Sequence, residues 1–99
     1  MHKGGFVYII TNKNRTTLYI GVTSDLIGRV YQHKNHTYKK SFSDRYNLEF
    51  LVYYEAFERI EFAIARETEI KKWNRNKKES LIYGFNPDWN DLYDEVMNK

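Results

Sequence analysis

The sequence contains no cysteine, and this absence excludes two classes of small protein. It rules out a disulfide-stabilised scaffold and any zinc or iron–sulfur site held by cysteine thiolates. No apolar run approaches membrane-spanning length, and the run at residues 6–10 is too short for the apolar region of a signal peptide. We therefore expect a cytoplasmic protein with no membrane partner. Its 99 residues should form one domain, because they leave room for a single core.

The charge balance is mildly basic, with a formal net charge of +3 and a pI of about 9.1. A basic protein favours polyanionic partners, because cations that neutralise phosphates release condensed counterions. Residues 71–78 carry five cations among eight residues. This run is either a nucleic-acid-binding surface or a solvated helix end that is stabilised by the helix dipole. The charge alone is a weak indication of a nucleic-acid partner.

Periodicity and turn residues predict the order of helices and strands. Two β-rich segments flank a polar turn at residues 11–16 and predict a hairpin. A helix should follow from Ser24 or Asp25 to about residue 35, and residues 36–47 read as a loop because they show no period. The remaining elements are a strand at 48–57, helices at about 58–74 and 77–83, with Gly84 ending the latter, and a short helix within 91–97. The pattern predicts an α+β domain with a three-stranded, mainly antiparallel sheet flanked by helices, in the order ββαβαα plus a short C-terminal helix.

Two tyrosines of the predicted hairpin form a candidate site. If the turn is centred between residues 13 and 14, Tyr8 lies directly across from Tyr19, and Gly21 lies opposite Phe6. Two phenols on one face can position water, and a phenol with a lowered pKa can accept its proton. The alternative is an aromatic pair that only packs across the two strands.

The first predicted helix adds a cation and an imidazole to this face. Arg29 and His33 are four residues apart, so they project from the same side of the helix. The planar guanidinium of arginine suits phosphate recognition, and a histidine can transfer a proton or orient water. The alternative is that Arg29 forms an ion pair with Asp25 and that His33 is an ordinary surface residue.

Glu67 is an acidic residue set among apolar ones on the long helix. At 100° per residue it lies near the middle of a stripe that contains Ile60, Ala63, Ile64, Ile70 and Asn74. A carboxylate is costly to bury without a partner, so something must compensate its charge. One carboxylate with waters and substrate phosphate is typical of Mg²⁺. The alternative is a structural ion pair with Arg29 or Arg66.

Five sequence elements, in order and at matching spacing, resemble the GIY-YIG nucleases. They are Phe6-Val7-Tyr8, Tyr19-Ile20-Gly21, the stretch from Gly21 to Arg29 with His33, Ala65-Arg66-Glu67-Thr68-Glu69-Ile70-Lys71-Lys72, and Asn86-Pro87-Asp88-Trp89-Asn90-Asp91-Leu92. The last two resemble the short, stand-alone bacterial branch of the family. The family also includes homing endonucleases, some restriction enzymes and the N-terminal nuclease domain of the bacterial excision-repair incision subunit. The resemblance covers roughly residues 5–93.

The resemblance implies a three-stranded antiparallel fold and hydrolysis of a phosphodiester with one divalent ion, Mg²⁺ or Mn²⁺. It implies that Tyr8 is the general base and that Tyr19 positions water and phosphate. It further implies that Arg29 stabilises charge on the phosphoryl oxygens and that His33 assists. Glu67 would hold the metal. The late asparagine of the family matches Asn90 best, with Asn86 as the other candidate.

The chain departs from the family pattern at two positions, and we expect no added DNA-binding domain. Phe6 stands where the family usually has glycine, and Val22 stands where several members carry a lysine. We expect a structure-selective or partner-dependent endonuclease that acts on DNA rather than RNA, with a protein partner as one source of specificity. Candidate nucleic-acid contacts are Lys39, Lys40, Arg45, Lys71, Lys72 and Asn90. The alternatives are a binding module of the same fold with little or no activity, and a protein–protein adaptor that uses exposed aromatic residues.

Overall fold

The computed structural model describes residues 4–98 and contains one antiparallel sheet. Its strands are β1 (Gly5–Thr11), β2 (Leu18–Thr23) and β3 (Phe50–Phe57), and their order across the sheet is β2-β1-β3. The central strand β1 therefore pairs with both of the others. This arrangement, with its flanking helices, confirms the predicted α+β class and the predicted order of elements.

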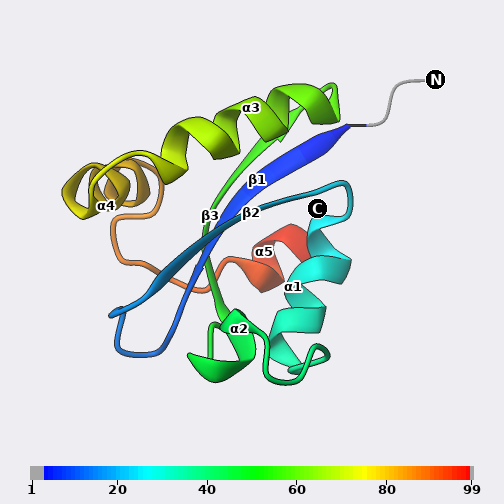
Figure 1. Ribbon diagram of the computed structural model, residues 1–99, viewed down its shortest axis with the longest axis vertical. Coiled ribbons are helices and arrows are strands. Elements are labelled where there is room, and N and C mark those ends of the chain that lie inside the picture. Colours follow the sequence, from blue (N-terminus) through cyan, green and yellow to red (C-terminus); the bar gives the residue numbers. More distant parts are fainter. Residues whose placement is uncertain (1–3, 99) are drawn as a thin grey trace.

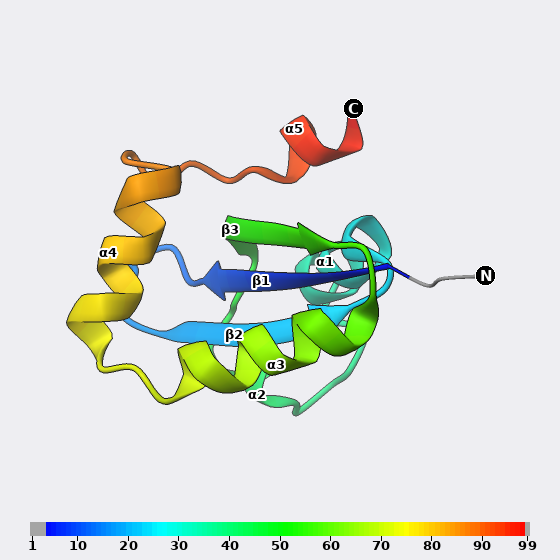
Figure 2. The same ribbon diagram turned by 90° about the horizontal axis from the view of Figure 1, so that it is seen from above.

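Helices cover both faces of the sheet (Figure 1). On one face lie α3 (Ile60–Lys71) and α4 (Arg75–Phe85), and on the other lie α1 (Leu26–Lys34), α2 (Phe42–Arg45) and α5 (Tyr93–Met97). Seen from above, α3 runs along β2, at the edge of the sheet (Figure 2). Because β2 is an edge strand, a side chain on α3 can reach past it toward the α1 face.

The alternating residues of β1 enter two separate cores. Val7 and Ile9 pack toward α3 and α4, whereas Tyr8 and Ile10 pack toward α1, and all four side chains are fully buried. A strand covered on both faces reads as a continuous apolar run, which is what residues 6–10 show. The same packing places Tyr8 on the α1 side of the sheet, the side on which we expected a catalytic face.

The predicted hairpin register was wrong by two residues. Tyr8 pairs with Gly21 and Tyr19 pairs with Ile10, and residues 12–17 form the connection. The side-chain Oδ1 of Asn12 accepts hydrogen bonds from the backbone N–H groups of Thr16 and Thr17, at 2.9 and 3.1 Å, and so closes a loop that lies one residue further along the chain than the predicted turn at residues 11–16. Because side chains alternate with a period of two, a two-residue shift leaves both tyrosines on the same face.

Several predicted boundaries also differ. Helix α3 stops at Lys71 because Asn74 caps the next helix, accepting a hydrogen bond from the backbone N–H of Lys77 at 2.9 Å. Gly84 does not end α4, which continues to Phe85. The segment predicted as a loop contains α2, capped by Ser41, and β3 begins at Phe50 rather than at residue 48. Within residues 4–98 no helix has both the length and the apolar character needed to span a membrane.

Candidate active site

The side chain of Tyr8 lies directly against the backbone of β2 at Gly21, and the absence of a side chain on Gly21 makes room for the phenol. A Cβ added to Gly21 would lie 2.5 Å from both Cζ and Oη of Tyr8, closer than non-bonded atoms approach. The phenol therefore occupies the space that any other residue at this position would fill. The predicted pairing of Gly21 with Phe6 was wrong: Gly21 pairs with Tyr8, and Phe6 pairs with Thr23.

Three rings meet beside Gly21 on the α1 face. The ring centroids of Tyr8 and Tyr19 are 6.3 Å apart, and each lies 5.8 Å from the centroid of His33. Tyr8 Oη and His33 Nε2 are hydrogen-bonded at 3.1 Å. The structure thus brings together three side chains, from β1, β2 and α1, that the sequence analysis assigned to one face.

Helix α1 is oriented by its cap and by two apolar anchors. The carboxylate of Asp25 accepts a hydrogen bond from the backbone N–H of Gly28 at 3.1 Å, and Leu26 and Val30 are buried against the sheet. Asp25 is thus engaged as an N-cap, and among residues 4–98 no carboxylate lies within ion-pair distance of Arg29. The guanidinium of Arg29 is therefore available for an external anion.

The protonation states of Tyr8 and His33 follow from burial and from the charges nearby. Burial raises the pKa of Tyr8 well above its usual range, the charges of Tyr19 and Glu67 raise it further, and Arg29 opposes them. Burial and the charge of Arg29 lower the pKa of His33 to about 4. At neutral pH the phenol and the imidazole are both uncharged.

Glu67 is mostly buried on the side of α3 that faces the sheet. Its side chain is 18 % exposed, and its ion-pair partner is Lys71 Nζ at 3.4 Å, on a lysine side chain that is 53 % exposed. Neither arginine that we considered as a partner pairs with it, since Arg66 binds Glu55 and Glu69 instead. Glu67 raises the pKa of Tyr8, so its carboxylate lies within electrostatic reach of the Tyr8 phenol.

The predicted apolar stripe around Glu67 is narrower than we expected. Ala63 and Ile70 are buried, but Ile64 is 47 % exposed and Asn74 is exposed, so neither belongs to the stripe. The remaining residues follow the spacing i, i+3, i+7 and i+10 from Ile60, which places Glu67 on the buried line. The acid itself was placed correctly by the helical period.

The donor set suits a hard divalent cation better than zinc. In the described part of the chain no group of three or more histidine, cysteine, aspartate or glutamate side chains could hold a metal. Mg²⁺ commonly binds through one or two carboxylates and completes its shell with water and substrate phosphate. Glu67, whose ion-pair partner is a solvent-exposed lysine, fits this type of site.

The other residues that we predicted to contact nucleic acid lie outside the cluster formed by the rings of Tyr8, Tyr19 and His33. Asn86 is buried and structural: its Nδ2 donates to Val52 O at 3.2 Å and to Asn90 O at 2.8 Å, and its Oδ1 accepts from Asn90 N at 3.1 Å. Asn90 is exposed, and its role stays a prediction. Lys39, Lys40 and Arg45 lie on or beside α2, and Lys71 and Lys72 lie at the end of α3.

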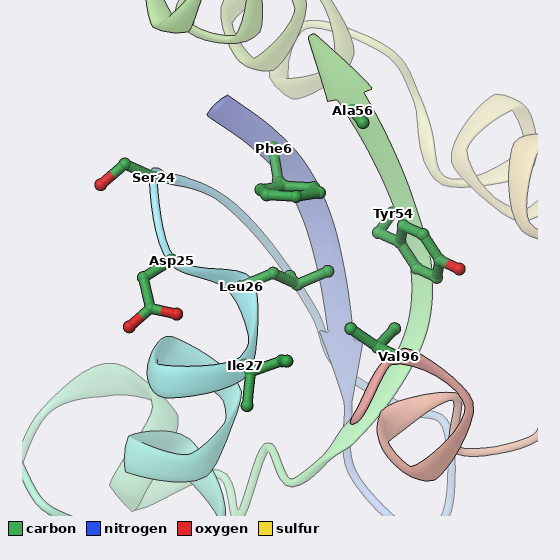
Figure 3. A pocket seen from close by; sticks show the side chains of 8 residues that line it. All are labelled: Phe6, Ser24, Asp25, Leu26, Ile27, Tyr54, Ala56 and Val96. Carbon is green, nitrogen blue, oxygen red and sulfur yellow. The ribbon is translucent and has the colours of Figure 1, made fainter. Parts of the chain in front are cut away.

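An apolar cavity of about 420 Å³ lies between α1, α5 and the strands β1 and β3 (Figure 3). It is lined by Phe6, Ser24, Asp25, Leu26, Ile27, Tyr54, Ala56 and Val96. None of the residues of the candidate site belongs to this lining. The cavity is therefore distinct from the candidate site.

One neighbour of the site was missed in the sequence. The ring of Phe42 on α2 lies 6.1 Å from that of Tyr19. We assigned residues 36–47 to a loop, and the only available signal was the four-residue spacing between Phe42 and Tyr46.

Replacing Gly21 by alanine should displace the Tyr8 phenol, because the new methyl group overlaps it. Overpacking of this kind costs about 1–3 kcal/mol of unfolding free energy, which chemical denaturation would measure. Gly84→Ala is the matched control: nothing lies within 4 Å of its added Cβ, and Gly84 is in the last turn of α4. This control should gain up to about 1 kcal/mol, and equal stability of the two variants would contradict the assigned packing.

Two histidines should titrate on opposite sides of the ordinary histidine pKa. Hydrogen bonds that the His36 imidazole donates to the carboxylates of Glu49 and Asp44 raise its pKa, whereas the pKa of His33 is lowered to about 4. The stabilising contribution of His36 is therefore present at low pH and is lost as pH rises through its folded pKa. For His33 the pH dependence has the opposite sign. Its lowered pKa costs no unfolding free energy above about pH 6.5, and the free energy of unfolding falls as the pH drops from there toward 4. NMR titration of the imidazole signals, assigned with His33→Gln and His36→Gln, checks the order, and a His33 pKa above that of His36 would contradict it.

Comparison with known proteins agrees with this geometry. The model of the GIY-YIG catalytic domain matches residues 4–80. A UPF0213 protein of Clostridium perfringens is 40 % identical over 77 residues, which cover 78 % of this chain and 81 % of the relative. A UPF0213 protein of Haloquadratum walsbyi is 36 % identical over 76 residues, covering 77 % and 83 %.

A solved structure supports the same grouping. The solution NMR structure of a UPF0213 protein from Bacillus halodurans has a TM-score of 0.56 and 29 % identity, and the match covers 90 % of this chain and 93 % of that one. The resemblance inferred from the five sequence elements is thereby confirmed. The chain belongs to the GIY-YIG family, a nuclease superfamily, and is similar to its small UPF0213 members.

Proposed function

We propose that this protein is a cytoplasmic endonuclease that hydrolyses phosphodiester bonds in DNA with one Mg²⁺ or Mn²⁺ ion at Glu67. The observation that carries the proposal is the position of Glu67, a mostly buried carboxylate within electrostatic reach of Tyr8. Around the same spot lie a second phenol, an imidazole and a guanidinium that forms no ion pair with any carboxylate of residues 4–98. This combination supplies a metal ligand, water-positioning groups and a phosphate anchor.

Arg29 is the residue that would bind the scissile phosphate. Its planar guanidinium can donate two parallel hydrogen bonds to phosphoryl oxygens, and its charge opposes the negative charge that grows there during displacement. The partly buried position of Arg29 strengthens this interaction, because water screens it less. Tyr19, from the neighbouring strand, would orient the phosphate and the attacking water.

Tyr8 would receive a proton from the attacking water after losing its own. His33 Nε2, at 3.1 Å from the phenol oxygen, is in position to accept the phenol proton. The charge of Glu67 contributes to the raised pKa of Tyr8, so neutralising that carboxylate makes the phenol more acidic. When bound, the divalent ion would supply Lewis-acid stabilisation of the phosphoryl and leaving oxygens.

Substrate selection would rest on few groups. We expect preference for a DNA structure of the repair type, or a protein partner that supplies specificity. Lys39, Lys40, Arg45, Lys71 and Lys72 are exposed and would contact phosphates. Such contacts position the substrate without reading its sequence.

A cleavage panel tests the proposal. Duplex, flap, bubble and single-stranded DNA, with RNA counterparts, are incubated with excess protein and Mg²⁺, Mn²⁺, Ca²⁺ or EDTA. The proposal predicts nicking of at least one DNA with Mg²⁺ or Mn²⁺ and none with EDTA. Absence of cleavage of every substrate with every metal would contradict it.

The raised pKa of Tyr8 favours one alternative, a nucleic-acid-binding module with little activity. A fully buried, protonated phenol is a poor base in its resting state, and Val22 leaves the strand without the lysine that several family members carry there. This alternative predicts salt-dependent DNA binding without cleavage. Glu67→Ala would leave that binding unchanged.

A further inference from the structure

A row of aromatic rings leads from the candidate site onto the surface of α2. The ring centroid of Tyr19 is 6.1 Å from that of Phe42, which is 4.7 Å from that of Tyr46. Phe42 and Tyr46 are 49 % and 45 % exposed, respectively. Because Tyr19 also contacts Tyr8 and His33, this exposed row is continuous with the site.

The segment that carries the row is held by polar contacts. His36 lies between two carboxylates, with Nδ1 2.7 Å from Asp44 Oδ1 and Nε2 hydrogen-bonded to Glu49. Ser41 caps α2 by accepting a hydrogen bond from the backbone N–H of Asp44 at 3.2 Å. These contacts connect the segment to the start of β3, so the two exposed rings lie on an anchored element.

The charges around the row are positive. Lys39, Lys40 and Arg45 are exposed, and within residues 4–98 none of them has an ion-pair partner. The two carboxylates of the segment, those of Asp44 and Glu49, are both engaged by His36. Exposed aromatic faces next to unpaired cations are typical of surfaces that bind single-stranded nucleic acid. The cores of protein–protein interfaces are instead depleted of lysine.

We infer that Phe42 and Tyr46 form a stacking platform for unpaired bases of single-stranded DNA beside the scissile phosphate. The inference rests on the proposed function and narrows its substrate class to DNA with an unpaired segment. The bases of a continuous duplex are stacked on one another and offer no free face to Phe42. Unpaired bases can stack on the row while Lys39, Lys40 and Arg45 contact their phosphates.

Binding measured without catalysis tests the platform. Fluorescence anisotropy of a labelled oligothymidylate and of a duplex of equal length is recorded in EDTA at low salt. Phe42→Ala should weaken single-strand binding about fivefold or more, the loss expected for one stacked base, and leave duplex binding unchanged. Phe42→Leu keeps an apolar side chain but lacks a ring, so it should show the same loss, whereas Phe42→Trp should bind as the wild type does.

Phe62→Ala is the matched control, because Phe62 is 56 % exposed on α3, on the opposite face of the sheet. Equal losses for single strand and duplex, wild-type binding by Phe42→Leu, or a loss with Phe62→Ala would overturn the platform. Tighter binding of oligouridylate than of oligothymidylate would overturn the choice of DNA. Because the assay needs no cleavage, an inactive protein with selective binding would refute only the nuclease proposal. An active enzyme whose Phe42→Ala variant cuts all substrates as the wild type does would refute only the platform.

Discussion

Glu67→Gln is expected to lower the metal-dependent cleavage rate by about 10³-fold or more. A bound metal supplies several kcal/mol of transition-state stabilisation, and each 1.36 kcal/mol corresponds to a factor of ten in rate. Glutamine keeps the size of the side chain but removes the charge that would hold the ion. Single-turnover cleavage of the preferred substrate, with Mg²⁺ varied, measures the loss.

The Glu67→Gln variant should still fold. A mostly buried carboxylate whose ion-pair partner is an exposed lysine lowers the free energy of unfolding, because its desolvation is poorly compensated. Thermal melting should therefore show equal or higher stability. Glu61→Gln serves as the matched control: Glu61 is on the same helix, is exposed, and pairs with Arg59. Full activity in Glu67→Gln, or an equal loss in Glu61→Gln, would contradict the role given to Glu67.

Arg29→Lys is expected to lower kcat by about 10²- to 10³-fold, the loss typical of removing one preorganised donor to developing charge. Lysine keeps the positive charge but cannot offer the planar pair of donors that matches two phosphoryl oxygens. Because the interaction strengthens in the transition state, KM should change little. Steady-state kinetics separate the two parameters.

Arg59→Lys is the control for this substitution, since Arg59 lies at the exposed start of α3. A second readout is independent of catalysis. The charge of Arg29 lowers the pKa of His33, so Arg29→Gln should raise the pKa of the His33 imidazole as measured by NMR. Wild-type kcat in Arg29→Lys would show that Arg29 does not stabilise the reacting phosphate.

Local periodicity was sufficient to predict which side chains share a face. Tyr8 and Tyr19 share one because strand side chains alternate, and Glu67 lies on the buried line of α3 because the helical period places it there. The register itself could not be predicted, since the side chain of Asn12 organises the loop that sets it. The contact between Tyr8 and Gly21 was missed for the same reason.

Contacts between distant segments were beyond the reach of sequence patterns. The pairing of Arg66 with Glu55, on β3, could not be foreseen from spacing. Arg66 also pairs with Glu69 on its own helix, and the ion-pair partner of Glu67 is Lys71. Phe42 packs beside Tyr19 because His36 anchors the α2 segment through hydrogen bonds that carry no periodic signal. Tertiary contacts of this kind decide the environment of each functional group after the elements have formed.

The position of a bound divalent ion tests the central claim most directly. Substoichiometric Mn²⁺ added to isotope-labelled protein broadens the NMR signals of nearby nuclei. We expect the strongest broadening at Glu67 and at Tyr8 and Gly21 on the strands, and we expect Glu67→Gln to abolish it. Broadening centred on Asp44 and Glu49, or a pattern unchanged in Glu67→Gln, would contradict the assignment of a metal-dependent site at Glu67.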